Sequence, residues 1–149
     1  MNLEESIQQT KPFRTNKEKV LVNLIYTYNW VSAEMKDYFA QFGITPKQYN
    51  ILRILNGVDE PVSIAFIRER LLHKLSDVSR IVDRLHNREL IQKDTCHQDR
   101  RLIDVQLSPK GKNLLNTTDE SEDSIASIMH RLTAEEAATL SSLLDKIRN

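Results

Sequence analysis

The apolar residues of this chain recur mostly three or four positions apart, and this spacing constrains the fold more than any other feature. From about residue 17 to residue 42 they form one continuous stripe, as in an amphipathic helix. The 149 residues include only three glycines, which leaves little material for tight β turns. The sequence therefore predicts a mainly α-helical protein with a small β component, and Gly43 is the predicted C-terminal cap of this first long helix.

Two shorter helices are predicted next. Thr45, Pro46 and Gln48 form a capping box with proline at the first helical position, which predicts a helix over residues 46–56. Ser63 can cap the following helix, whose apolar residues are spaced by three and four: Ile64, Ile67 and Leu71.

A fourth helix and a β hairpin follow. Ser76 can cap a helix whose apolar face consists of Val78, Ile81, Val82 and Leu85. After Arg88 the apolar period changes to two or to short runs, over residues 90–93 and 102–107, as expected for strands. Two strands around a charged tip predict a hairpin.

Two more helices are predicted in the C-terminal part. Ser108 and Pro109 can begin a long helix whose apolar face consists of Leu114, Leu115, Ile125, Ile128 and Met129. Thr133 and Glu136 belong to a second capping box, and the helix that it begins has the apolar face Leu140, Leu143, Leu144 and Ile147.

The order helix, helix, turn, helix and hairpin between residues 46 and 107 predicts a winged helix-turn-helix. A helix that enters a major groove needs an apolar face toward its own domain and short polar or basic groups near its N-terminus. The fourth helix fits, with the candidate DNA contacts Lys74, Ser76, Asp77, Ser79, Arg80 and Arg84. The hairpin tip adds Arg100 and Arg101, and a narrow minor groove attracts arginine side chains.

Each of these features has an ordinary alternative when taken alone. An amphipathic helix with two outer arginines is often only a solvated helix, and an Arg-Arg pair in a turn is often plain surface. Their joint order favours DNA binding, because Arg80 and Arg100 are 20 residues apart with a predicted hairpin between them.

Four stretches resemble the MarR family of bacterial transcriptional regulators: residues 75–85 (LSDVSRIVDRL), 90–91 (LI), 99–101 (DRR) and 107–111 (LSPKG). The resemblance implies a dimeric winged helix-turn-helix repressor or activator, in which the first and the last two helices form the dimerisation region. It also implies that residues 76–88 enter the major groove and that Arg100 reaches the minor groove. Asp99 and Arg101 would brace the wing rather than read bases.

Two positions depart from the family pattern. Glu89 occupies the end of the fourth helix, where the family usually has glycine. Glutamate tolerates a left-handed cap poorly, so we expect this turn to be either strained or differently capped. Cys96, the only cysteine, stands at the wing tip, where proline is common. Its neighbours His97, Arg100 and Arg101 leave a redox role open, and the alternative is a solvent-facing cysteine with no sensing role.

The net charge of zero, with 21 basic and 21 acidic residues, argues at first against a nucleic-acid partner. Residues 62–112, however, hold 11 basic and 7 acidic residues, whereas residues 113–149 hold 3 basic and 7 acidic ones. Residues 1–61 hold seven of each. The basic excess therefore lies on the predicted winged segment.

The first and last helices carry more apolar side chains than a small winged domain can cover, which suits a helical dimer interface. These side chains are Tyr26, Tyr28, Trp30, Met35, Tyr38, Phe39, Ile125, Ile128, Met129, Leu140, Leu143 and Leu144. We therefore expect one structural domain in three parts: residues 1–45 for dimerisation, 46–112 as the DNA-binding lobe, and 113–149 for dimerisation.

The expected function is that of a homodimeric repressor that binds a pseudopalindromic operator and is released by a small ligand or a stress signal. The expected partners are double-stranded DNA, a second copy of the chain and a small aromatic or phenolic effector, with no cofactor and no metal. In the family such effectors often bind between the dimerisation region and the DNA-binding lobe. The candidate effector residues are Tyr26, Trp30, Met35 and His73, although aromatic residues on a helix stripe are more often core.

Two other functions are weighed against this one. A winged-helix module that binds another protein fits the same fold, but the basic helix and wing disfavour it. An enzyme is disfavoured because no glycine-rich phosphate loop, metal-ligand cluster or nucleophile–base pair stands out. No apolar run approaches the ~18 residues of a spanning helix, and residues 1–12 lack a signal core, so we expect a cytoplasmic protein without membrane partners.

Overall fold

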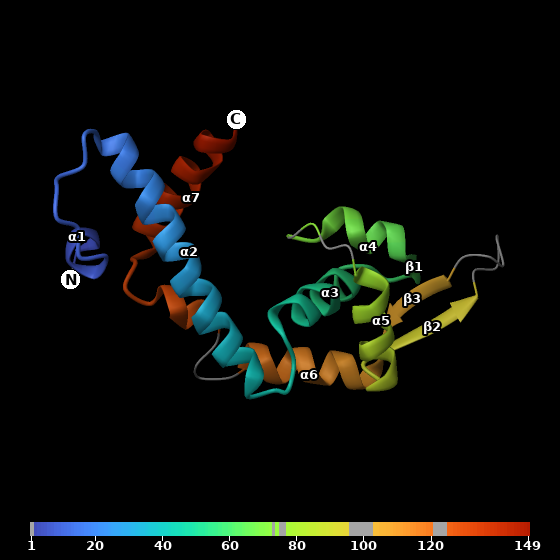
Figure 1. Ribbon diagram of the computed structural model, residues 1–149. Coiled ribbons are helices and arrows are strands. Elements are labelled where there is room, and N and C mark those ends of the chain that lie inside the picture. Colours follow the sequence, from blue (N-terminus) through green and yellow to red (C-terminus); the bar gives the residue numbers. More distant parts are fainter. Residues whose placement is uncertain (1, 73, 75–76, 96–102, 121–124) are drawn as a thin grey trace.

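The computed structural model describes residues 2–72, 74, 77–95, 103–120 and 125–149. Its helices are α1 (Leu3–Ser6), α2 (Asn16–Ala40), α3 (Pro46–Asn56), α4 (Ile64–Arg70), α5 (Val78–Asn87), α6 (Pro109–Glu120), the 3-10 helix η1 (Ile125–Met129) and α7 (Ala134–Arg148). The antiparallel strands β1 (Val62–Ser63), β2 (Ile91–Thr95) and β3 (Ile103–Leu107) form a sheet in the order β1-β3-β2. The predicted winged helix-turn-helix class is confirmed (Figure 1).

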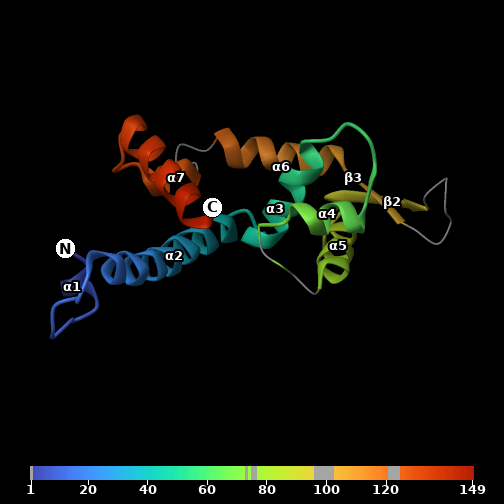
Figure 2. The ribbon, with the colours of Figure 1, turned by 90° about the horizontal axis from the view of Figure 1, so that it is seen from above.

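The chain is elongated, with the winged lobe at one end, the N-terminus at the other, and the C-terminus between them (Figure 1). The lobe consists of α3, α4, α5 and the sheet, and the β2–β3 hairpin projects from it. α2 leads into the lobe, and α6 runs from the sheet back toward the C-terminal part of α2. Figure 2 shows α1 and α7 at the end of the molecule that lies away from the wing.

The turn that ends α2 depends on Gly43, as the sequence predicts. Gly43 has a φ of +67°, which glycine adopts without a steric penalty. Its N–H donates to the carbonyl of Ala40 at 3.0 Å, and the N–H of Ile44 donates to the carbonyl of Phe39 at 3.1 Å. These paired bonds are those of a Schellman cap.

Both predicted capping boxes are present. At α3 the Thr45 hydroxyl accepts the N–H of Gln48 at 3.2 Å, and the Gln48 side chain accepts the N–H of Thr45 at 3.0 Å. At α7, Thr133 and Glu136 make the same reciprocal pair. The hydrogen bond from the Thr133 backbone lowers the pKa of the Glu136 carboxyl below its ordinary value.

One apolar core joins the lobe to the end of α2. Its largest fully buried side chains are Phe39, Ile51, Leu52, Leu55, Ile67, Leu85, Ile91, Leu115, Val78, Val82 and Val105. Burying each such side chain contributes roughly 1.5–3 kcal/mol relative to leaving it in water. The ring of Phe39 stacks on Tyr49 of α3 with 4.2 Å between centroids, and burial raises the pKa of the Tyr49 hydroxyl.

Two polar contacts attach α6 to the helices before it. The buried hydroxyl of Tyr38 in α2 donates to the carbonyl of Thr118 at 2.6 Å. Arg53 of α3 pairs with Asp119, with 2.8 Å between Nη1 and Oδ2. The end of α6 is therefore fixed to both α2 and α3.

Glu89 is left-handed, with a φ of +60°, so the turn keeps the strained cap rather than a different one. The N–H of Leu90 donates to the carbonyl of Leu85 at 3.0 Å, so Glu89 takes the position that glycine normally fills in a Schellman cap. Two contacts stabilise this turn. Ser108 Oγ donates to the Glu89 carbonyl at 2.6 Å, and Lys110 Nζ lies 3.0 Å from Glu89 Oε2.

The predicted long helix after Ser108 is wrong. α6 is described as far as Glu120, and residues 125–129 form a 3-10 helix instead of continuing the same α-helical face. Residues 116–124 (NTTDESEDS) contain no apolar side chain, and threonine, serine and aspartate are poor helix formers. The sequence therefore offers no apolar face that continues from Leu115 to Ile125.

Three smaller differences concern short or local features. The N-cap of α5 is Asp77 rather than Ser76, and Ser76 lies outside the described residues. Asp77 makes no side-chain cap bond, because its backbone (φ −111°, ψ 27°) is not extended as a capping residue usually is. The sequence also gave no prediction of α1 or of β1, which are four and two residues long.

In the part of the chain that the structure describes, no helix is long and apolar enough to cross a membrane.

We predict that Glu89→Gly stabilises the protein by about 1 kcal/mol, because glycine removes the cost of a left-handed glutamate. Urea unfolding monitored by circular dichroism measures the change. Lys110→Ala is the control, since it removes the same exposed ion pair without altering the turn and should change stability by less than about 0.5 kcal/mol. A lower unfolding midpoint for Glu89→Gly would contradict the expected strain.

Candidate nucleic-acid interface

Helix α5 has one face in the core and one face in solvent. Val78, Ile81, Val82 and Leu85 are buried against the lobe. Ser79, Arg80, Asp83, Arg84 and Asn87 are exposed on the opposite side. The apolar spacing therefore places the predicted DNA-contacting residues of this helix, Ser79, Arg80 and Arg84, on one accessible surface.

The charged side chains on this surface differ in whether they already have an ion-pair partner. Asp83 is paired with Lys93 of β2, with 2.6 Å between Nζ and Oδ1, so its negative charge is largely balanced. Within the described ranges, neither Arg80 nor Arg84 has an ion pair or hydrogen bond to its guanidinium group. The exposed face of α5 therefore presents two unbalanced positive charges, four residues and about one helical turn apart.

The N-terminal side of α5 is described in part. Asp77 and Lys74 are both exposed. A carboxylate at this position repels phosphate but can accept a hydrogen bond from the amino group of cytosine. The predicted DNA contacts Ser76 and Arg100, the wing residues Asp99 and Arg101, and the ligand candidate His73 lie outside the described residues, and their roles stay predictions.

Helix α4 adds a basic residue that the sequence reasoning did not single out. Arg68 is exposed and, among the described residues, makes no ion pair. Arg70 is held differently: its guanidinium lies 3.4 Å from the centroid of the Phe66 ring and donates to the Phe66 carbonyl at 3.3 Å. Arg68 could have been found from the sequence, because it lies in the basic last turn of the short helix just before the predicted recognition helix. In a helix-turn-helix the first helix crosses the DNA backbone.

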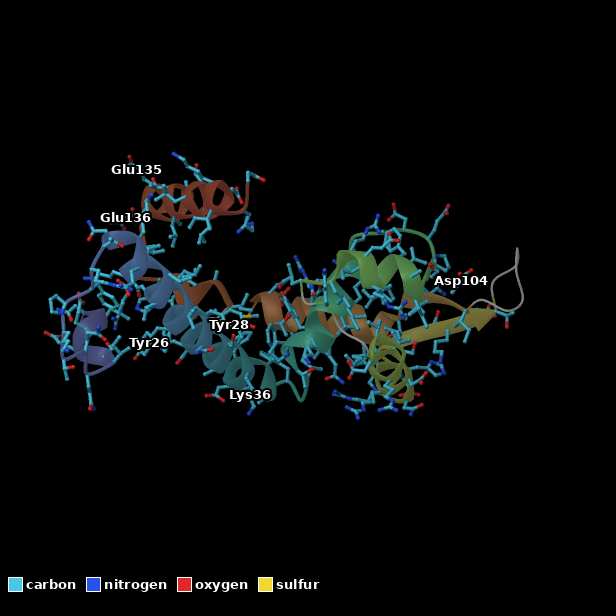
Figure 3. The ribbon with its side chains drawn as sticks, turned by 45° about the horizontal axis from the view of Figure 1, so that its top comes forward. Tyr26, Tyr28, Lys36, Asp104, Glu135 and Glu136 are labelled. Atoms are coloured by element: carbon cyan, nitrogen blue, oxygen red, sulfur yellow. The ribbon has the colours of Figure 1, made fainter. Side chains whose placement is uncertain are left out.

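Of the three predicted effector residues that the structure describes, it brings two together. Tyr26 and Trp30, four residues apart on α2, line a cavity of about 160 Å³ together with Leu3 of α1. Figure 3 shows Tyr26 on α2, at the end of the molecule that also holds Glu135 and Glu136 of α7. Met35 is nine residues from Tyr26, about 180° around the helix, and packs against the core instead.

Helix α1 forms the other wall of this cavity because it is fixed to α2 by an ion pair. Lys19 Nζ lies 2.5 Å from Glu4 Oε1, and this hydrogen bond lowers the pKa of the Glu4 carboxyl. Among the described residues, no group of three or more potential metal-ligating side chains is present.

Three features together define the winged helix-turn-helix class of proteins: a buried core, an exposed basic helix (α5) and a projecting hairpin. Residues 42–111, which span α3 to the start of α6, match the model of the MarR family. The resemblance to the MarR family found in the sequence is therefore confirmed over this segment. The family and the fold are those of transcription regulators.

Three relatives illustrate the match. The HTH-type transcriptional regulator MhqR of Bacillus subtilis (strain 168) is 26% identical over 99 residues, which are 66% of this chain and 67% of that protein. The organohalide-sensing regulator RdhR, solved in its 2,4-dichlorophenol-bound form, has a TM-score of 0.79 and 20% identity, covering 95% of this chain and 86% of that one. A mutant of MarR from E. coli, complexed with operator DNA, has a TM-score of 0.75 and 23% identity, covering 91% and 99%.

We predict that Arg80→Ala and Arg84→Ala each lower the salt concentration at which the protein elutes from heparin, because each removes an unbalanced exposed charge. The matched control is Arg14→Ala, which removes an arginine next to Glu18 near the chain's other end. Equal shifts for all three variants would show that only total charge matters and that α5 does not form the anion-binding face.

Proposed function

We propose that this protein is a homodimeric MarR-type repressor that binds a pseudopalindromic operator and is released by a small aromatic or phenolic ligand. The observation that carries the proposal is the pair of unbalanced arginines, Arg80 and Arg84, on the exposed face of a helix whose other face is buried. The relative complexed with operator DNA shares this fold over 91% of the chain.

In this proposal α5 lies in the major groove and the wing reaches the minor groove. Arg80 is close to the N-terminus of α5, the part of a recognition helix that contacts base edges, and arginine binds guanine in a bidentate manner. Arg84, one turn further along, is placed for a phosphate contact. Arg100 is the proposed minor-groove residue.

The proposed dimer interface consists of the apolar faces of α2 and α7. No residue of α7 is buried within one chain, and Leu140, Leu143 and Ile147 are 44%, 54% and 60% exposed on one face. α2 likewise exposes a stripe that includes Val20, Leu21, Leu24 and Ile25. Contiguous apolar surface of this kind marks a protein interface, and a second copy supplies the matching surface by two-fold symmetry.

The proposed effector site is the Tyr26–Trp30 cavity between α1 and α2. Its aromatic walls and modest volume suit one aromatic ring, and Ser6, Asn23 and Thr27 at its edge can bind a hydroxyl. The relative in its 2,4-dichlorophenol-bound form supports the choice of a phenolic ligand class. A winged-helix module that binds only another protein remains the alternative function, and the DNA-binding test below distinguishes the two.

We predict that the protein selects a defined duplex from a random-sequence DNA library and binds it with an affinity that falls steeply with salt. Arg80→Ala should cost roughly 1–3 kcal/mol and relax the preference at one base pair of each half-site, whereas Arg84→Ala should weaken all duplexes alike. Arg100→Ala should also lower affinity. Unchanged affinity of Arg100→Ala, or no salt-dependent binding by the wild type, would favour the protein-interaction alternative.

We also predict that the wild type sediments at twice the mass of one chain and that Leu143→Lys shifts it to the monomer. A lysine charge buried in an apolar interface costs at least about 2 kcal/mol per site. Lys146→Ala, on the same helix, is the control and should keep the dimer. Sedimentation velocity at several concentrations measures both, and an unaffected Leu143→Lys dimer would exclude this face of α7 from the interface.

A further inference from the structure

Arg88, the C-cap residue of α5, joins this helix to the end of α2. Its Nη1 donates a hydrogen bond of 2.6 Å to the carbonyl oxygen of Gly43. Gly43 lies in the turn between α2 and α3, 45 residues earlier in the sequence. One side chain therefore connects the exposed basic helix to the turn at which α2 enters the lobe.

The place of this bond makes it stronger than an ordinary surface contact. α2 and α5 both end in a left-handed turn, at Gly43 and at Glu89. The carbonyl groups at a helix C-terminus carry partial negative charge, and a cation there is stabilising. The Arg88 guanidinium lies at the turn that ends α2, where its charge is favoured, and a charge-assisted hydrogen bond adds to this.

The residue after Arg88 attaches the same turn to α6. The Glu89 carbonyl accepts from Ser108 Oγ at 2.6 Å, and the Glu89 carboxylate pairs with Lys110 in the first turn of α6. The C-terminal end of α5 is thus fixed both to the end of α2 and to the beginning of α6. These are the two helices that connect the lobe with the rest of the chain (Figures 1 and 2).

We propose that Arg88 is a positioning residue for DNA recognition, which sets the orientation of α5 relative to α2 and thereby the separation of the two α5 helices in the dimer. This inference rests on the proposed function, because it assumes a dimer with two DNA-binding lobes. Arg88 acts through the Gly43 carbonyl and not through a base contact, so its loss changes which half-site spacing is accepted rather than which bases are read.

Half-site spacing is a sensitive measure of this orientation. One added base pair turns the second half-site by about 35° around the DNA axis and moves it by about 3.4 Å, since a helical turn takes 10–10.5 base pairs. A dimer whose α5 helices are rigidly placed binds such a duplex poorly. A dimer whose α5 helices tilt freely binds it almost as well as the natural spacing.

The first experiment uses the duplex that the wild-type protein selects from a random library, together with versions lengthened and shortened by one base pair at the centre. We expect the wild type to bind the altered spacings about tenfold more weakly or worse. We expect Arg88→Ala to reduce this discrimination to less than about threefold and Arg88→Lys, which retains a donor and the charge, to give an intermediate value.

Two control variants separate positioning from general effects. Arg84→Ala should weaken binding to all three duplexes by a common factor and keep the wild-type discrimination, because it removes a proposed phosphate contact only. Arg14→Ala, whose side chain is 89% exposed and lies near the N-terminus, should leave both affinity and discrimination unchanged. A general loss of folded protein would also weaken all three duplexes equally, and thermal melting of each variant measures that loss directly.

The second experiment does not require DNA. Spin labels at Ser79→Cys in α5 and Lys36→Cys in α2, in a Cys96→Ser background and diluted with unlabelled chain, report the distance between the two helices. We expect a narrow distance distribution for the wild type, a broader or displaced one for Arg88→Ala, and partial recovery for Arg88→Lys. Where Arg88→Ala lowers the melting temperature below the measuring range, Arg88→Gln replaces it in both experiments.

The outcomes separate this inference from the proposed function. If the wild type selects no duplex, the proposed function fails, and the spin-label distances still decide whether Arg88 fixes α5 relative to α2. If Arg88→Ala keeps both the wild-type spacing discrimination and the narrow distance distribution, Arg88 has no positioning role. If affinity falls equally on all spacings while the distance is unchanged, Arg88 contacts DNA directly and the inference is overturned.

Discussion

The placement of the winged lobe depends on the close approach of α6 to the turn that ends α5. A Cβ added at Gly111 would lie 2.1 Å from the carbonyl oxygen of Leu90, so a side chain at this position is sterically excluded. Ser108 pairs the polar groups around this contact. Its N–H donates to the Leu90 carbonyl at 3.2 Å, and its hydroxyl donates to Glu89 and accepts the Gly111 N–H at 2.9 Å. Ser108 thereby joins the turn after α5 to the start of α6, and the polar groups named here all have hydrogen-bond partners.

The same contact fixes the base of the wing. Ile91, the first residue of β2, pairs with Leu107, the last residue of β3, and Ser108 follows directly. The bonds made by Ser108 therefore hold the open end of the hairpin at the C-terminus of α5. Because these bonds involve backbone groups on both sides, α5, the wing and α6 form one continuous unit. A displacement of α6 is expected to move α5 and the wing together.

The sequence predicted the features that local interactions determine. The capping boxes at Thr45 and Thr133 involve residues three apart, and the strained turn at Glu89 is one of the two outcomes that its place at a helix end left open. Contacts between distant segments left no such signal. β1 is too short to show a period of two, and nothing in the sequence indicates that Arg88 binds the carbonyl of Gly43.

The site was predictable to a similar extent. The apolar period of α5 was enough to place Arg80 and Arg84 on its exposed face, because a helix with a buried stripe must expose the opposite side. The effector candidates were placed less well: Tyr26 and Trp30 lie together, but Met35, which was grouped with them, lies nine residues and half a turn from Tyr26 and packs against the core. The pairing of Asp83 with Lys93 was not predictable, because it depends on how β2 packs beside α5.

The zero net charge of the chain is compatible with DNA binding because of how its acidic groups are held. Asp83 and Glu89 are each paired with a lysine, so within Val78–Asn87 the unbalanced charges are those of Arg80 and Arg84. One such face, with so few cations, gives weak binding on its own. In the proposed dimer the second face binds as an intramolecular event at a high effective concentration, but only when both lobes match the DNA simultaneously. Weak single faces therefore make the rigid attachment of α5 to α2 and α6 a condition for specificity, because a lobe that tilted freely would lose the advantage of the second contact.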